Sequence, residues 1–201
     1  MTAMPRNRTA QASGVGDAEL IAHLARGEMT ALGQLYDRYD GDVRRLIARL
    51  GVRDGDVDDL VQATFLDALK SAARFDGRES AKPWLLGIAV MLVRRHRRSV
   101  ARLAARIAAW AAEPFRTNAR TPEELAERTQ DADRAQRALE SLSPKKREAF
   151  VLVVLEGMTG EAAARALGIP APTVGTRVHH ARKEIREFLQ LDGQQRKGSE
   201  P

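Results

Sequence analysis

The sequence predicts an all-α protein of two small helical domains joined by a linker, and three observations support this fold class. Helix-forming residues dominate the 201-residue chain, whereas aromatic residues make up only 4% of it. Apolar residues recur every three or four positions, which is the spacing of one helix face, and no stretch alternates like a β-strand. A stretch with two prolines and little periodicity, residues 113–122, divides the helical segments into two groups.

The composition favours a polyanionic partner. The chain has 33 Lys and Arg against 27 Asp and Glu, which gives a formal net charge of +6. The absence of cysteine excludes disulfides and thiolate metal sites, in agreement with a reducing cytosol. No apolar run is long enough to cross a bilayer, and residues 1–16 lack the apolar core of a signal peptide. We therefore expect a cytoplasmic protein with no membrane insertion.

The first helices follow a tail. Residues 1–16 have no periodicity and are expected to be flexible. Asp17 is expected to cap a short helix that ends at Gly27, and a longer helix is expected from Thr30 to Leu50. Its apolar stripe consists of Leu32, Leu35, Tyr36, Tyr39, Val43, Leu46, Ile47 and Leu50, and the arginines expected to face away are Arg44, Arg45 and Arg49.

An aspartate-rich segment is expected to begin the next helix, which runs to about Ala73, because negative charge is favourable at a helix N-terminus. These aspartates are Asp54, Asp56, Asp58 and Asp59. Further along, Asp59, Gln62 and Leu66 share a face at spacings of three and four. An apolar side chain among polar groups suggests a partner surface, although one exposed leucine on a solvated face is equally compatible with the sequence.

A strongly basic helix is expected after a loop, with Ser80 as its N-cap and Pro83 in its first turn. Residues 80–112 contain seven Lys or Arg and no acid. Four arginines recur at every fourth position, namely Arg94, Arg98, Arg102 and Arg106. Such a stripe without an acidic partner repels itself unless an anion binds, so we favour a nucleic-acid phosphate backbone over an ordinary solvated face.

The C-terminal part predicts a helix-turn-helix. Ser143 as N-cap and Pro144 at the first helical position begin a support helix that stops at Gly157. Thr159 caps a second helix, and Gly168 ends it, since glycine adopts the left-handed conformation of a tight turn. The expected inward residues are Phe150, Val153 and Val154 in the support helix, and Ala163, Ala164 and Leu167 in the second.

The third helix of this motif is expected to begin near Pro172. Its apolar stripe consists of Val174, Val178, Ala181, Ile185 and Phe188, and its outer face shows Thr173, Gly175, Thr176, Arg177, His179, His180 and Lys183. These outer side chains are largely of the types that bind phosphates and base edges in the major groove. An ordinary three-helix bundle with a solvated outer face is the alternative.

Two stretches resemble one family. Residues 58–66, followed by Arg74-Phe75 and the helix at 83–89, resemble region 2 of the extracytoplasmic-function (ECF) sigma factors of the sigma-70 family. Residues 142–182 resemble their region 4. The resemblance covers about residues 17–110 and 135–190. The corresponding division of the chain is a tail at 1–16, a region 2-like domain at 17–111, a linker at 112–134, a region 4-like domain at 135–191 and a tail at 192–201.

The resemblance implies a sigma factor that binds core RNA polymerase and directs promoter-specific transcription initiation by recognising the −10 and −35 elements. It implies no covalent chemistry, cofactor or metal. The implied partners are promoter DNA and the polymerase, through the clamp helices of its largest subunit and its flap, and an anti-sigma factor is a common further partner in the family.

The resemblance also implies site residues. Those for the polymerase are Asp59, Gln62 and Leu66; those for −10 DNA are Arg74, Arg78, Arg94, Arg95, Arg98 and Arg102; and those for −35 DNA are Arg165, Thr173, Thr176, Arg177, His179, His180 and Lys183. The chain departs from the family pattern at several positions, which are Ala63, Met91, Arg95, Gly160, Ala163 and Gly175. Glycine within a helix costs about 1 kcal/mol relative to alanine, so Gly175 indicates either a close approach of DNA or a lost contact.

Two alternatives to a sigma factor fit the sequence less well. A stand-alone helix-turn-helix regulator, with the N-terminal helices as a dimerisation or ligand domain, explains the C-terminal motif but not the arginine helix. An enzyme is disfavoured, because the four histidines have no metal-ligand spacing with carboxylates and no nucleophile motif is found.

Overall fold

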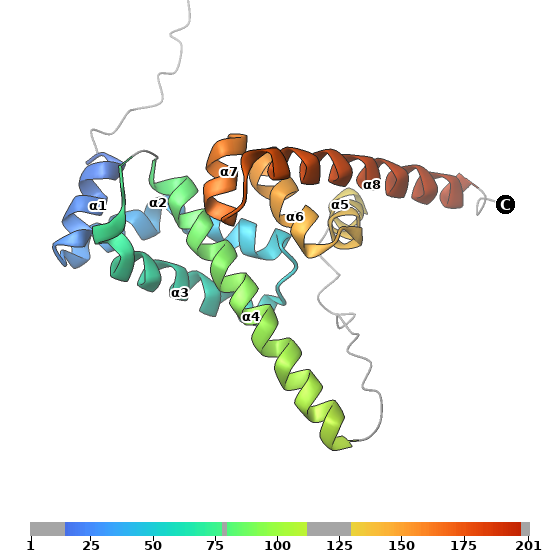
Figure 1. The fold of residues 1–201 in the computed structure, drawn as a ribbon, viewed down its shortest axis with the longest axis horizontal. Coiled ribbons are helices and arrows are strands. Elements are labelled where there is room, and N and C mark those ends of the chain that lie inside the picture. The colour runs from blue at the N-terminus through green and yellow to red at the C-terminus, as the bar shows by residue number, and fades with distance from the viewer. Residues whose placement is uncertain (1–14, 78–79, 112–129, 198–201) are drawn as a thin grey trace, which may run out of the picture.

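The structure is a computed structural model that describes residues 15–77, 80–111 and 130–197, and no residue in these ranges lies in a β-strand. The predicted all-α fold, with two helical domains, is therefore confirmed (Figure 1). In the same ranges, no helix is long and apolar enough to span a bilayer.

The first domain packs its helices around one apolar core. Its elements are α1 (Asp17–Ala25), α2 (Met29–Arg49), α3 (Asp54–Ser71), a 3-10 turn η1 (Ala72–Arg74) and α4 (Ala81–Ala111). Most of the predicted stripe of α2 is buried, and one side of α3 is buried as well, because helical spacing places these residues on one side of each helix. Helix α4 is long, and its C-terminal half projects from the body of the molecule (Figure 1).

The prediction that Asp17 caps its own helix is wrong. Gly16 occupies the N-cap position of α1, and Asp17 is the first helical residue. Its carboxylate accepts hydrogen bonds from Tyr39 Oη, from Arg38 Nη1 at 2.5 Å and from the backbone N–H of Ala81 at 3.1 Å. Asp17 thus caps α4 instead, because tertiary packing brings the start of α4 beside α1.

This environment shifts two pKa values. Partial burial acts to raise the pKa of Asp17, but the hydrogen bonds from Tyr39, Arg38 and Ala81 outweigh it and lower that pKa. Burial and the hydrogen bond to Asp17 raise the pKa of Tyr39 to about 12. Asp17 is therefore held as a carboxylate and Tyr39 as a neutral phenol.

The second domain contains the predicted helix-turn-helix. Its elements are α5 (Gln130–Ser141), α6 (Pro144–Phe150), a π-helical turn η3 (Val151–Leu155), α7 (Gly160–Leu167) and α8 (Ala171–Lys197). The Thr159 hydroxyl accepts the Ala162 N–H at 3.1 Å, and Gly168 has a φ of 64°. The predicted cap and the predicted turn between α7 and α8 are therefore confirmed.

The support helix differs from its prediction. Phe150, Val153 and Val154 are only partly buried, and the fully buried side of this segment instead includes Ala149, Val151 and Leu152 together with the charged Arg147 and Glu148. The π-helical turn at Val151–Leu155 inserts an extra residue and so shifts Val153 and Val154 from the face that α-helical spacing predicts. In the described region, Ser143 occupies the N-cap position without a side-chain cap bond.

The predicted boundaries also differ at the C-terminal end. Helix α8 continues to Lys197, although a tail was predicted from residue 192. Helix α5 begins at Gln130, inside the predicted linker, and the part of the linker at 112–129 lies outside the described residues, as do the tails at 1–14 and 198–201.

The two domains pack against each other, with α7 lying against α4 (Figure 1). The contact is close because both helices present small residues: a Cβ built on Gly87 of α4 lies 3.3 Å from the Cβ of Ala166 of α7. At the other side of the interface, Arg147 of α6 donates to the Leu50 carbonyl at 3.2 Å. The linker therefore joins domains that are already in contact.

Candidate nucleic-acid and polymerase interfaces

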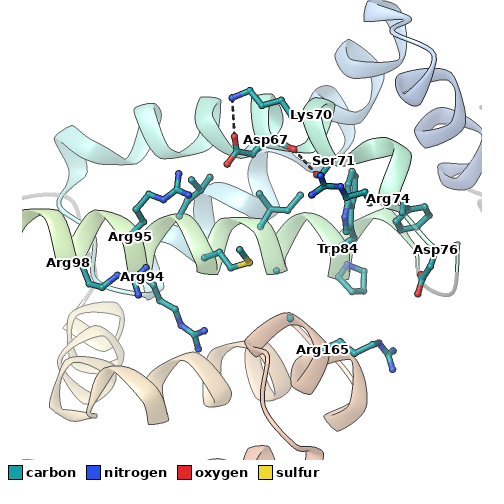
Figure 2. Close-up of a pocket in the computed structure, with 17 residues that line it drawn as sticks. Asp67, Lys70, Ser71, Arg74, Asp76, Trp84, Arg94, Arg95, Arg98 and Arg165 are labelled. Atoms are coloured by element: carbon teal, nitrogen blue, oxygen red, sulfur yellow. Dashed lines mark hydrogen bonds and ion pairs between the residues drawn. The ribbon is translucent and has the colours of Figure 1, made fainter.

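A pocket of about 790 Å³ lies between the domains, bounded by α3, α4 and α7 (Figure 2). Its polar wall is mostly cationic, with Lys70, Arg74, Arg94, Arg95, Arg98 and Arg165 against Asp67 and Asp76. An excess of positive charge around a concave surface favours an anionic ligand with several charges.

One wall of the pocket is aromatic. The rings of Phe75 and Trp84 have centroids 5.2 Å apart and are tilted by 57°. Trp84 is half-buried and lines the pocket. Aromatic faces beside cations form the surface on which unpaired nucleobases stack while their phosphates are neutralised. The Arg74-Phe75 pair, which is part of the region 2 resemblance, is the sequence feature that pointed to this aromatic wall.

The arginine stripe of α4 is divided by the packing of the domains. Arg98 and Arg102 of the stripe are exposed, and so is the neighbouring Arg95, as contact with DNA requires. Arg94 instead binds Glu148 of α6, with Nη2 and Nε at 2.7 and 3.1 Å from the same carboxylate oxygen. The expectation that the stripe has no acidic partner is therefore wrong for Arg94, because that partner lies 54 residues later in the chain. Arg78 and the side chain of Arg106 lie outside the described residues.

Arg97 belongs to the same interface but was not among the predicted site residues. It donates to the Leu50 carbonyl, and its Nη1 lies 3.9 Å from Glu148 Oε1. Burial lowers the pKa of Arg97, and attraction to Glu148 acts in the opposite direction. Helical spacing could not single out this residue, since its partners come from α2 and α6.

The outer face of α8 carries the residues predicted for −35 DNA. Thr176, His179, His180 and Lys183 are exposed, while Thr173 and Arg177 are partly buried. The two histidine rings meet edge to face with centroids 5.7 Å apart. A Cβ on Gly175 would have no described atom within 4 Å, so packing inside the described protein does not require glycine at that position.

Arg165, which was predicted for −35 DNA, is exposed on α7 at the border of the pocket between the domains (Figure 2). The same pocket is also lined by arginines predicted for −10 DNA. The tertiary packing places it at the boundary between the two predicted DNA surfaces.

The predicted polymerase surface is exposed on α3. Asp59 and Gln62 are accessible, and Leu66 keeps 44% of its surface exposed. The rings of Tyr36 of α2 and Phe65 of α3 have centroids 4.8 Å apart and are tilted by 53°. An exposed apolar side chain set among polar ones is suited to a protein partner. Among the described residues, no group of three or more His, Asp or Glu could hold a metal ion.

Comparisons with known proteins agree with this two-domain arrangement. Residues 35–103 match the family Sigma-70 region 2, and residues 132–185 match Sigma-70, region 4. The ECF RNA polymerase sigma factor SigC of Mycobacterium tuberculosis is 35% identical over 176 residues, which cover 83% of this chain and 87% of SigC. The RNA polymerase sigma factor CarQ of Myxococcus xanthus is 33% identical over 172 residues, covering 81% of this chain and 91% of CarQ.

Solved structures show the same fold. CnrH, in complex with the cytosolic domain of CnrY, has a TM-score of 0.66 at 27% identity, covering 88% of this chain and 98% of that one. The sigma factor RpoE of Bartonella quintana, in complex with the anti-sigma factor NepR, has a TM-score of 0.62 at 24% identity, covering 80% and 97%.

Both domains, in this order, define a sigma-70-type transcription initiation factor. The chain belongs to the ECF sigma factors of that family and directs transcription initiation as a partner of RNA polymerase and promoter DNA. A stand-alone regulator is not supported, because the match includes region 2 as well as the helix-turn-helix domain.

Proposed function

We propose that this sigma factor holds core RNA polymerase through the exposed face of α3. Asp59 and Gln62 supply polar contacts to the clamp helices of the largest subunit, and Leu66 supplies an apolar one. The exposure of all three residues on one helix face supports this role. We expect the flap to be contacted by the second domain, as the family resemblance implies.

We propose that the first-domain wall of the pocket between the domains binds the −10 element. The Phe75–Trp84 wall receives an unpaired base by stacking, and the surrounding arginines neutralise the phosphates of the melted strand. The arginines assigned to this role are Arg74, Arg94, Arg95, Arg98 and Arg102, together with Arg78, which lies outside the described residues. Arg94 must first leave Glu148 to take part.

We propose that α8 enters the major groove at the −35 element. Thr173, Thr176 and Arg177 lie at its N-terminal end, which is the part of a recognition helix that meets base edges. His179, His180 and Lys183 follow along the exposed side, where they meet base edges or phosphates, and Arg165 of α7 reaches the adjacent backbone. The domain limits 17–111 and 135–191 remain predictions.

We further propose that the protein performs no covalent chemistry and works in the cytoplasm, where core polymerase and DNA are found. An anti-sigma partner is proposed as well, because the open cationic pocket with its aromatic wall suits an acidic amphipathic segment. The observation that carries the whole proposal is the combination of this pocket with an independent recognition helix in one chain.

The test is whether the purified chain comigrates on a sizing column with bacterial core polymerase that lacks any sigma subunit. The double variant Asp59→Ala/Gln62→Ala should bind at least about tenfold more weakly, which corresponds to 1.4 kcal/mol. Asp54→Asn, which removes an exposed carboxylate at the start of the same helix, should bind like the parent. A chain that does not comigrate with polymerase yet binds duplex DNA as a dimer would overturn the proposal.

A further inference from the structure

Gly175 stands at an exposed position near the start of the recognition helix α8, where the fold does not need a glycine. A Cβ built on this residue meets no described atom within 4 Å. Its backbone is helical, so any residue could adopt the same conformation. Glycine lowers the stability of a helix relative to alanine. The reason for glycine at this position is therefore to be sought outside the described protein.

A hollow of about 300 Å³ lies beside Gly175, between α8, η3 and the first residue of α7. Most of its lining residues are apolar or lack a side chain, namely Val153, Gly160, Ala171, Val174, Gly175 and Val178. The polar lining residues are His179 and Arg182, and both are exposed. They follow Gly175 by four and seven residues, a spacing that places all three on one helix face. The hollow therefore borders the face of α8 proposed for −35 DNA.

Thr176 adds an apolar group beside this hollow. Its Oγ1 donates a hydrogen bond to the Pro172 carbonyl at 3.1 Å, so the hydroxyl does not donate to a base at the same time. The side chain is exposed, and its methyl group remains for contact with a partner. In the major groove, the C5 methyl group of thymine is the apolar feature of the base edges, and a threonine methyl group is one of its usual partners.

We propose that Gly175 and Thr176 recognise the C5 methyl group of a thymine in the −35 element. The missing side chain of Gly175 lets α8 lie close to the base pairs, so that the thymine methyl group enters the hollow against the Thr176 methyl group. His179 and Arg182 contact the neighbouring phosphates. This inference rests on the proposed role of α8 at the −35 element.

The first test removes the methyl group from the DNA. The probe is a promoter duplex that the holoenzyme selects from a pool randomised over the −35 element. Each thymine of the selected element is then replaced singly by deoxyuridine, which lacks only the C5 methyl group. At least one replacement should weaken binding of the holoenzyme about fourfold, the effect expected for one buried methyl group. A selected element without thymine, or binding that no replacement changes, overturns the proposal.

The second test fills the space at Gly175. Gly175→Ala should bind the selected duplex at least about fivefold more weakly, since its methyl group takes the place of the thymine methyl group. The same variant should unfold at a higher temperature, because alanine favours the helix. If the glycine marked only a lost contact, alanine would leave binding unchanged.

Gly33→Ala is the matched control, because Gly33 is an exposed helical glycine of α2 whose added Cβ also meets no described atom within 4 Å. It should raise the unfolding temperature and bind the duplex like the parent. Two results for Gly175→Ala count against the proposal: binding that is unchanged or stronger, and weaker binding with a lower unfolding temperature, since the glycine would then serve the fold.

A third variant tests the threonine. Thr176→Ser keeps the hydroxyl that binds Pro172 but removes the methyl group, so it should bind the thymine and deoxyuridine duplexes alike. A serine variant that still prefers thymine as strongly as the parent would refute the role of Thr176. If the parent holoenzyme selects no −35 sequence at all, the proposed function of α8 is wrong. A selected element that binds the parent and Gly175→Ala equally refutes this inference alone.

Discussion

The Asp17 carboxylate accepts the backbone N–H of Ala81 at 3.1 Å, so the first residue of α1 caps a helix that begins 64 residues later. The same carboxylate binds Arg38 and Tyr39 of α2. One side chain thereby connects three helices of the first domain. A carboxylate at a helix N-terminus is favoured by the free N–H groups and by the helix dipole.

The free energy of unfolding should depend on the charge of Asp17. Its pKa is lowered by folding from the usual 3.8, so its stabilising effect is complete above that value and is lost as the pH falls through the lower folded pKa. Asp17→Asn should lower the free energy of unfolding at pH 7 by about 1–2 kcal/mol. Urea unfolding at a series of pH values should show that the difference in free energy of unfolding between the parent and Asp17→Asn becomes smaller below about pH 4.

The matched control for this experiment is Asp37→Asn, which removes an exposed carboxylate from the neighbouring helix. It should change the free energy of unfolding by less than about 0.5 kcal/mol at any of these pH values. A constant gap between the parent and Asp17→Asn down to pH 2 would show that the charge of Asp17 is not what stabilises the fold.

The helix-turn-helix should depend on the Thr159 cap. Thr159→Ala removes the acceptor of the Ala162 N–H and should lower the free energy of unfolding by about 1 kcal/mol. Ser143→Ala changes an N-cap without a described side-chain cap bond, so it should have a much smaller effect. Equal losses for the two variants in chemical unfolding would contradict this distinction.

Arg98 and Arg94 should differ in their effects on promoter opening. Arg98→Gln removes an exposed cation at the pocket. In a plot of the logarithm of open-complex formation against the logarithm of salt concentration, it should reduce the magnitude of the slope by about one. Arg94→Gln should do the same and should also destabilise the packing of the domains, because Glu148 loses its closest partner. Opening rates over a salt series, combined with thermal unfolding, separate the two effects; unchanged opening by both variants would exclude them from the −10 surface.

Arg177 should contribute to recognition of the −35 element and not to polymerase binding. Arg177→Ala should reduce initiation from −35-dependent promoters by about tenfold or more, in line with 1–3 kcal/mol for a specific side-chain contact to a base. Its binding to core polymerase should be unchanged on the sizing column. Arg26→Ala, at an exposed position after α1, controls for the loss of one charge. If Arg177→Ala also loses polymerase binding, the effect comes from misfolding or from a wrong domain assignment.

Periodicity and local capping determined most of the secondary structure. The buried residues of α2 and α3 follow from helical spacing, and the turn between α7 and α8 follows from Thr159 and Gly168, because these signals act within a few residues. The family resemblance supplied the two domains and their order. These features are local or carried by motifs, and a single sequence contains them in full.

Only the tertiary structure determined which partners the charged side chains bind. Asp17 caps α4 rather than α1, Arg94 binds Glu148 rather than remaining free in the stripe, and Arg165 of α7 lines the pocket between the domains. Arg147 and Glu148 are both charged, yet both are buried at the packed face of the support helix. Ion pairs between distant segments depend on how the helices pack, and that packing has no signature in the spacing of residues along one helix.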